Sequence, residues 1–120
     1  MKIAVEMPWR KNLSVNHMRF GPGGHYRKKP EVQEWMAVLT WGTKAQQWMK
    51  DIPTDKVAIV VDFYYPDARR RDDHNFYKVI CDAVAAGLGI DDKDIRISTG
   101  EIVVDREEPG FTITITDMIE

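Results

Sequence analysis

Residues 57–65 read Val-Ala-Ile-Val-Val-Asp-Phe-Tyr-Tyr, and this stretch decides the fold that the sequence predicts. Its β-branched and aromatic residues favour a strand. A nearly continuous apolar run of this length is typical of a central strand that is covered on both faces. Pro66-Asp67-Ala68 then ends the strand. We therefore expect these residues to form the centre of a sheet that carries helices.

Two stretches with helical spacing flank this strand. In the first, Pro30 suits the opening turn of a helix, and Glu31 and Glu34 are favourably placed against the helix dipole. Apolar residues follow at helical intervals, with Gly42 as a possible break: Val32, Trp35, Met36, Leu39, Ala45, Trp48 and Met49. The second helix has an apolar face of Phe76, Val79, Ile80, Ala83 and Val84, and we expect Gly87 and Gly89 to close it.

Three further strands complete the predicted order β-α-β-α-β-β. They are Lys2 to Met7, Ile95 to Val104, and Phe111 to Thr116, the last two joined by a turn at Glu108-Pro109-Gly110. This order predicts an α/β (α+β) fold with a mixed four-stranded sheet and helices, in one domain over residues 1–120. Between Pro8 and Lys29 we expect a long connection, with a mobile loop at Gly21-Pro22-Gly23-Gly24.

Composition excludes several classes of protein. The only cysteine is Cys81, which rules out an internal disulfide and a zinc cluster built from cysteines. No apolar run is long enough to span a bilayer, and the first residues lack the apolar stretch of a signal peptide. These features favour a cytoplasmic protein with no membrane partner. The net charge of -2 decides nothing about nucleic acid, because the basic residues are clustered at 27–29 and 69–71.

The candidate chemistry lies in residues 69–78, Arg-Arg-Arg-Asp-Asp-His-Asn-Phe-Tyr-Lys. Asp72 is a plausible N-cap of the second helix. In an extended chain Asp72 and His74 point to one side and Asp73 to the other, and Lys78 follows His74 by about one helical turn. Carboxylates, a cation and arginines are what metal-assisted phosphodiester hydrolysis requires. The other interpretation is a solvated charged face that the helix dipole alone would favour.

A wider sequence pattern supports the first interpretation, metal-assisted phosphodiester hydrolysis. The motif Arg-Arg-Arg-Asp-x-x-Asn-x-x-Lys, a helix with Asp82-Ala83, and Gly-x-x-x-Asp-Asp ending at Asp92 resemble the RusA family of crossover junction endodeoxyribonucleases. The resemblance also covers a first strand ending in Pro8-Trp9, a loop with Asn12 and Asn16, and the core from Val57 to Thr116. It implies a homodimer that uses Mg²⁺ or Mn²⁺ to cut branched DNA at four-way (Holliday) junctions.

The family's functional residues map onto this chain one by one. The resemblance implies a catalytic set of Asp72, Lys78 and Asp92, and a metal-binding set of Asp72, His74, Asp91 and Asp92. We expect DNA contacts from Arg69, Arg70, Arg71, Asn75, Arg27, Lys28 and Lys29. His74 departs from the family, which has a second aspartate there. His74 could ligate the metal and favour Mn²⁺, Asp73 could replace it although it points the wrong way, or metal binding could be weakened.

The leading hypothesis is thus a metal-dependent endonuclease for four-way junctions. The alternative is a catalytically weak or inactive branched-DNA-binding protein on the same scaffold, which the change at His74 favours. A third possibility is that the basic residues bind RNA or a protein. We expect His17 and His25 to be surface residues. Trp35, Trp41 and Trp48 are expected to serve core or dimer-interface packing rather than base stacking, and Cys81 to be an inert small residue.

Overall fold

The computed structural model describes residues 2–14, 19–20, 27–50 and 56–117. Its elements, in chain order, are β1 (Lys2–Pro8), β2 (Arg19–Phe20), β3 (Arg27–Lys28), α1 (Pro30–Lys50), β4 (Val57–Tyr65), η1 (Asp73–Phe76), α2 (Tyr77–Leu88), η2 (Asp92–Asp94), β5 (Ile95–Val104) and β6 (Gly110–Asp117). The predicted α+β order is confirmed. The short β2–β3 pair lies where only a connection was expected, and the predicted loop at 21–24 lies outside the described residues.

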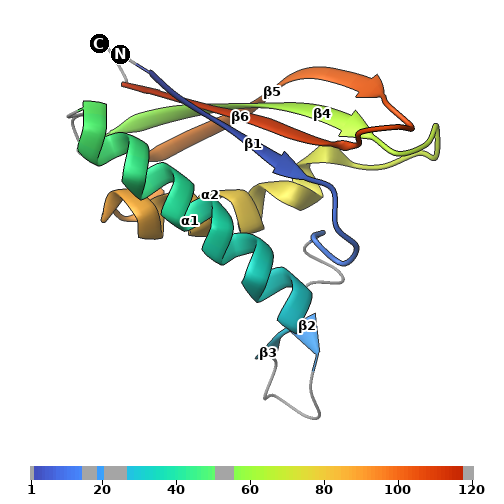
Figure 1. Cartoon of the computed structure of the whole chain (residues 1–120), viewed down its shortest axis with the longest axis horizontal. Coiled ribbons are helices and arrows are strands. Elements are labelled where there is room, and N and C mark those ends of the chain that lie inside the picture. The colour runs from blue at the N-terminus through green and yellow to red at the C-terminus, as the bar shows by residue number, and fades with distance from the viewer. Residues whose placement is uncertain (1, 15–18, 21–26, 51–55, 118–120) are drawn as a thin grey trace.

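The four long strands form one mixed sheet in the order β1-β6-β4-β5. Strands β1 and β4 are both antiparallel to β6, whereas β4 and β5 are parallel and are joined through α2. Because β1 and β4 share the same antiparallel neighbour, they run in the same direction (Figure 1). Their carboxyl ends, Pro8 and Tyr65, therefore lie at the same edge of the sheet, and so do the residues that follow each of them.

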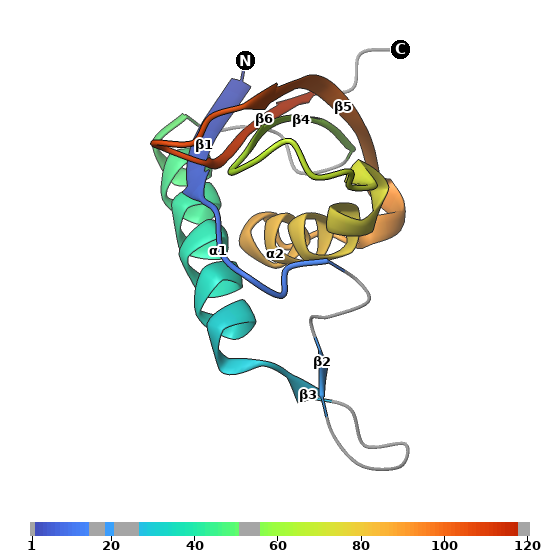
Figure 2. The ribbon, with the colours of Figure 1, turned by 90° about the vertical axis from the view of Figure 1, so that its right-hand side faces the viewer.

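In the described part of the chain, helices cover one face of the sheet and not the other, so the prediction that β4 is covered on both faces was wrong. Figure 2 shows α1 and α2 on the same side of the sheet. Every second residue of β4 faces the helices and is buried, namely Val57, Ile59, Val61, Phe63 and Tyr65. On the opposite face Val60 is 39% exposed. The run looked continuous because Ala58 and Val60 are also apolar, and apolar residues are common on protein surfaces.

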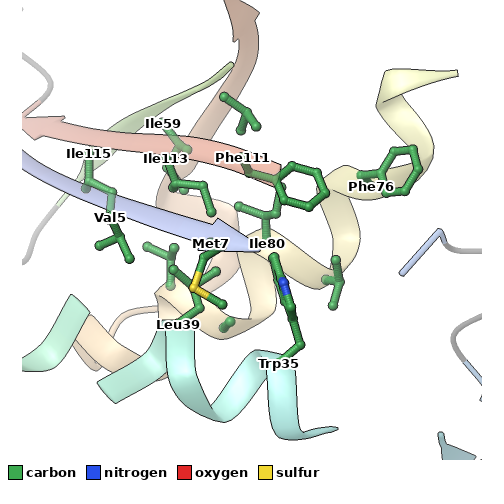
Figure 3. Packing of buried hydrophobic residues seen from close by; sticks show 14 of the residues in the cluster. Val5, Met7, Trp35, Leu39, Ile59, Phe76, Ile80, Phe111, Ile113 and Ile115 are labelled. Atoms are coloured by element: carbon green, nitrogen blue, oxygen red, sulfur yellow. The ribbon is translucent and has the colours of Figure 1, made fainter. Parts of the chain in front are cut away.

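The core lies between this covered face and the two helices (Figure 3). Near the edge that holds Tyr65 the core is aromatic: Phe63, Phe76 and Phe111 contact one another with ring centroids 5.6–6.1 Å apart. Trp9 stacks on Phe111 at 5.4 Å and so extends the cluster towards the surface. Large rings with few rotamers give this edge a well-packed base for the loops above it.

Gly87 and Gly89 were both predicted to close α2, but the structure gives them different roles. Gly89 closes α2 as predicted, with a left-handed φ of 72°. Gly87, however, lies within α2, where an added Cβ would approach the backbone oxygen of Thr40 to 2.7 Å. It allows α1 and α2 to approach closely. Gly42 does not break α1, which runs without interruption from Pro30 to Lys50.

The tryptophans of α1 have different environments. Trp35 is buried, and its Nε1 donates a hydrogen bond to the carbonyl oxygen of Pro8 at 2.7 Å. Trp41 and Trp48 are 68% and 87% exposed, which excludes the core alternative for these two and leaves dimer-interface packing as a prediction.

Candidate nucleic-acid interface

The turn after β4 begins with Asp67, whose carboxylate accepts a hydrogen bond from the backbone N–H of Arg69 at 2.9 Å. This hydrogen bond, followed by the interaction with Arg71, lowers the pKa of Asp67 below its usual value. A charged Asp67 thus holds the start of the arginine run in a fixed turn, and Arg69 and Arg70 extend from it into solvent.

Arg71 is held by the fold, unlike its two neighbours. Its guanidinium pairs with Asp67 at 2.9 Å and lies 5.2 Å from the ring centre of Trp9 and 5.0 Å from that of Tyr65. It also donates to the carbonyl oxygens of Asp67 and Arg69. Only 14% of its side chain is exposed. Arg71 was expected among the DNA contacts, but most of its hydrogen-bonding capacity is used within the chain.

Asp72 caps the helical segment, as predicted. Its Oδ1 accepts from the backbone N–H of His74 at 3.0 Å, and its carbonyl oxygen accepts from the N–H of Asn75 at 3.1 Å. The carboxylate remains exposed to solvent. Since a cap uses only part of the capacity of a carboxylate, Asp72 can still accept further hydrogen bonds or hold a cation.

Asp73 points the other way and is largely covered. The hydroxyl of Thr99, on β5, donates to Asp73. Because that hydroxyl has only one hydrogen, the Tyr77 hydroxyl must be the donor in its 2.5 Å contact with Thr99. His74 stacks on the Tyr77 ring at 4.8 Å, and its Nε2 lies 4.0 Å from Asp73. Asp73 therefore ties η1 to the edge strand.

Tyr65 lies beneath this segment with a hydroxyl that is buried and has no hydrogen-bond partner among the described residues. Burial raises the pKa of Tyr65 to about 12, and the charge of Asp73 acts in the same direction. The Tyr65 hydroxyl therefore remains protonated at any physiological pH.

A hollow of about 460 Å³ opens between the arginine segment and the residues that follow β1. We call it the basic hollow. It is lined by Trp9, Arg10, Lys11, Asn12, Leu13, Ser14, Arg69, Arg70, Arg71, Asp72, Asn75 and Phe76. Four basic side chains besides Arg71 thus surround Asp72 and Asn75. Such an arrangement suits an anionic ligand, and a nucleic-acid phosphate above all.

The contribution of Arg10 and Lys11 was missed in the sequence. They follow β1 after a single residue, Trp9, and the sheet topology brings the ends of β1 and β4 to one edge. The loop is held there by two hydrogen bonds: the Trp9 N–H donates to Pro109, and the Asn12 side chain donates to Glu31 at 2.7 Å. A pair of basic residues at a strand end was the available signal, but it has meaning only once the strand order is known.

The remaining predicted residues that the structure describes are not among those that line the hollow. Lys78 pairs with Asp82 at 3.2 Å. Asp91 caps η2, and the N–H of Lys93, followed by a hydrogen bond with Asp92, lowers the pKa of Asp91. Arg27 and Lys28 form β3, which with β2 and the following Lys29 projects from the body of the molecule (Figure 2). Lys28 and Lys29 do not line the hollow, and the side chain of Arg27 lies outside the described part of the structure.

The position of Asp92 can be inferred from Cys81. Burial is the main cause that raises the pKa of Cys81 to about 11, with Asp82 and Asp92 acting in the same direction and Lys78 opposing them. Asp92 therefore lies close enough to Cys81, on α2, for its charge to act on the thiol. A thiol with so high a pKa is unreactive, as expected for Cys81.

The donor chemistry and the geometry differ in how well they suit a metal ion. Within the described ranges no three His, Cys, Asp or Glu side chains lie close enough together to hold one. Mg²⁺, however, is often bound through one or two carboxylates together with substrate phosphates. Asp72, an exposed carboxylate at the rim of the basic hollow, fits a site of that open kind.

Comparison with known proteins gives one family. The family model described as Endodeoxyribonuclease RusA matches residues 10–116. A comparison with curated proteins gave no match. In the part of the chain that the structure describes, no helix is long and apolar enough to cross a membrane. The family match runs from Arg10, at one wall of the basic hollow, through the arginine segment at the other and on to β6. This chain belongs to the RusA family of endodeoxyribonucleases, enzymes that resolve Holliday junctions.

Proposed function

We propose that this chain is itself an active, metal-dependent endonuclease that cuts four-way DNA junctions by phosphodiester hydrolysis. The observation that carries the proposal is Asp72, an exposed carboxylate at the rim of a hollow lined by Arg10, Lys11, Arg69 and Arg70. A phosphate held by these cations would lie beside Asp72. Their affinity for phosphate does not depend on base sequence, which suits an enzyme that recognises a branched structure.

Each residue has a distinct role in this proposal. Arg69 and Arg70 bind the DNA backbone, and Asn75, which also lines the hollow, donates to a phosphate oxygen. Lys78 stabilises the negative charge that develops on the phosphate. The fixed turn at Asp67 and the packing of Arg71 keep the exposed groups in place, so that little ordering is needed when DNA binds.

A divalent cation would be held by Asp72 together with a phosphate of the DNA. The family resemblance offers Asp91, Asp92 and His74 as further ligands, although within the described ranges no three such side chains lie together. When bound, Mg²⁺ or Mn²⁺ supplies a water of lowered pKa and polarises the phosphate. Arg27, Lys28 and Lys29, on the projecting hairpin, remain candidates for a second contact with DNA outside the hollow.

The substrate also bears on the assembly. A four-way junction has two-fold symmetry, and two cuts at equivalent strands are needed to resolve it. A two-fold dimer places two identical sites in that relation. We therefore propose that the chain acts as a homodimer.

A second candidate function is binding of branched DNA with little or no cleavage. The observation that favours it is His74, which stands where the family has an aspartate and whose ring stacks on Tyr77. Replacement of His74 by aspartate separates the two functions. Cleavage by the wild type supports the nuclease. Cleavage that appears only in His74→Asp, with junction binding equal in both, supports the binding protein.

The principal test is cleavage of a labelled synthetic junction in Mg²⁺, in Mn²⁺ and in EDTA. Wild type, Asp72→Asn and Glu101→Gln are compared, the last being an exposed acid on β5 that serves as a matched control. We expect products with either metal, none in EDTA, none with Asp72→Asn, and normal cleavage with Glu101→Gln. Junction binding without products under every condition would contradict the nuclease.

A further inference from the structure

Helix α1 is apolar on two opposite faces. Val32, Trp35, Leu39 and Thr43 face the core and are buried. A second series lies on the other side of the helix, and we call it the outer stripe: Val38, Trp41, Ala45 and Trp48. Its spacing of three, four and three residues is the heptad pattern with which one helix packs against another. A helix that is apolar on both sides needs a partner on both sides, and the protein's own core supplies only one.

The outer stripe is exposed along its whole length. Val38, Trp41 and Trp48 are 56%, 68% and 87% exposed, and Ala45 is exposed as well. Neighbouring apolar side chains on this scale are unusual on a monomer and mark interaction surfaces. Tryptophan in particular is enriched at the centres of protein interfaces.

The sizes of these side chains favour an antiparallel helix as the partner. In a parallel two-fold pair each residue meets its own copy, so that tryptophan would face tryptophan and alanine would face alanine. In an antiparallel pair the first heptad position meets the fourth, so that Trp41 can face the smaller Val38 of the partner. Alternation of large and small side chains is what allows helices to interdigitate.

The charges favour the same orientation. Glu34 is exposed at the N-terminal end of the stripe, and Lys44 is exposed towards the other end, 5.4 Å from the ring centre of Trp41. A parallel pair would place like charges together at both ends. An antiparallel pair brings the acidic end of one helix to the basic end of the other.

We propose that α1 is the homodimer interface, and that it packs antiparallel against α1 of a second copy about a two-fold axis. Trp41 lies against the partner's Val38, Glu34 lies alongside the partner's Lys44, and Trp48 lies against the first turn of the partner's α1. Two tryptophans from each copy can bury roughly 300–500 Å². That is about half of the ~800 Å² per partner of a standard interface, and Val38, Ala45 and the flanking residues supply the rest. This inference rests on the dimer in the proposed function, and not on cleavage.

The first experiment measures the mass of the protein in solution over a range of concentrations, by light scattering and sedimentation. The test variant is Trp41→Gln/Trp48→Gln. The matched control is Ile102→Gln/Val104→Gln, which removes the exposed apolar residues of the edge strand β5. We expect a dimer for the wild type and the control. For the tryptophan variant we expect the dissociation constant to rise at least a hundredfold, with an unchanged circular dichroism spectrum because both rings are exposed.

The second experiment tests the orientation by exchanging charges. Glu34→Lys and Lys44→Glu each place like charges together in an antiparallel pair, so each is expected to weaken the dimer severalfold. The double variant restores opposite charges and should recover the wild-type dissociation constant. Single variants that weaken the dimer without recovery in the double variant would overturn the antiparallel arrangement.

The remaining outcomes separate this inference from the proposed function. A wild-type dimer that persists in the tryptophan variant, or that only the β5 control disrupts, overturns α1 as the interface and leaves the proposed homodimer intact. A wild type that is monomeric both alone and on a junction overturns the interface and the dimer together. Junction cleavage is measured in parallel, and its loss or retention reports on the nuclease alone.

Discussion

Arg71 and Asp73 lie on the inner side of one short segment, whereas Arg70 and Asp72 lie on its outer side. The inner pair is engaged by the protein: Arg71 contacts Trp9, Tyr65 and Asp67, and Asp73 accepts from Thr99. The outer pair extends into solvent at the basic hollow.

The two sides contain the same residue types, one arginine and one aspartate each. Residue type therefore does not distinguish a structural charge from one that is available to a ligand. The alternation of an extended chain does, because successive side chains point to opposite sides. The comparison predicts that inner substitutions act on stability and outer substitutions on DNA.

The largest expected effect is on the two aspartates. Asp72→Asn should lower junction cleavage by roughly 10²–10⁴-fold, the range for loss of a group that acts on the reacting atoms. Stability should change little, because asparagine caps helices about as well as aspartate. Single-turnover cleavage and urea denaturation measure the two quantities.

Asp73→Asn is the matched variant, and it should lose stability while it keeps most of its cleavage when folded. Equal loss of cleavage in the two folded variants would contradict the comparison.

A smaller effect is expected at Arg71. Arg71→Ala removes a guanidinium that packs against two aromatic rings and pairs with Asp67. We expect the free energy of unfolding to fall by roughly 1–2 kcal/mol, the size of a desolvated cation–π contact. Urea denaturation measures it, with the equally basic but exposed Arg69→Ala as a control that should remain near wild type. A stable Arg71→Ala with weakened DNA binding would place Arg71 with the outer residues instead.

Arg70 should behave in the opposite way. Arg70→Ala removes one candidate phosphate contact, so junction affinity should fall roughly tenfold at low salt, and the slope of log affinity against log salt should decrease by about 1. Fluorescence anisotropy at several salt concentrations measures both quantities. Stability should be unchanged, since the side chain is exposed. A fall in affinity with an unaltered salt slope would mean that Arg70 does not contact phosphate.

These contrasts show which structural features could be predicted from the sequence and which could not. The strand pattern of residues 57–65, the apolar face of α2 and the capping role of Asp72 are local properties, and local periodicity predicted each of them. The separation of Arg71 from Arg70 depends on Trp9, some sixty positions earlier in the chain. No local pattern contains that contact.

The same reason explains the other differences. Arg10 and Lys11 join the basic hollow only because β1 and β4 end at one edge of the sheet, which requires the strand order. Val60 and Trp41 are apolar residues on the surface, and an apolar residue does not by itself reveal which side of an element faces the core. Roles that depended on long-range packing were therefore those that the sequence left open.

The smallest expected effect is at Tyr65, which lies beneath the segment and whose buried hydroxyl has no hydrogen-bond partner in the described part of the chain. Tyr65→Phe removes a buried polar group without breaking a hydrogen bond, so at pH 7 the free energy of unfolding should rise by up to about 1 kcal/mol.

The difference between Tyr65→Phe and wild type should grow in alkali. Burial raises the pKa of Tyr65 from 10.0 to about 12, so the wild type loses stability as pH rises through this interval. The variant has a phenylalanine at position 65, which does not ionise, and so lacks this loss. Urea denaturation at pH 7 and pH 11 measures both effects. Tyr64→Phe is the control, because the Tyr64 hydroxyl accepts a hydrogen bond from Thr112 and its removal should not stabilise the protein. Destabilisation by Tyr65→Phe at pH 7 would mean that the hydroxyl supports Asp73 and belongs to the inner network.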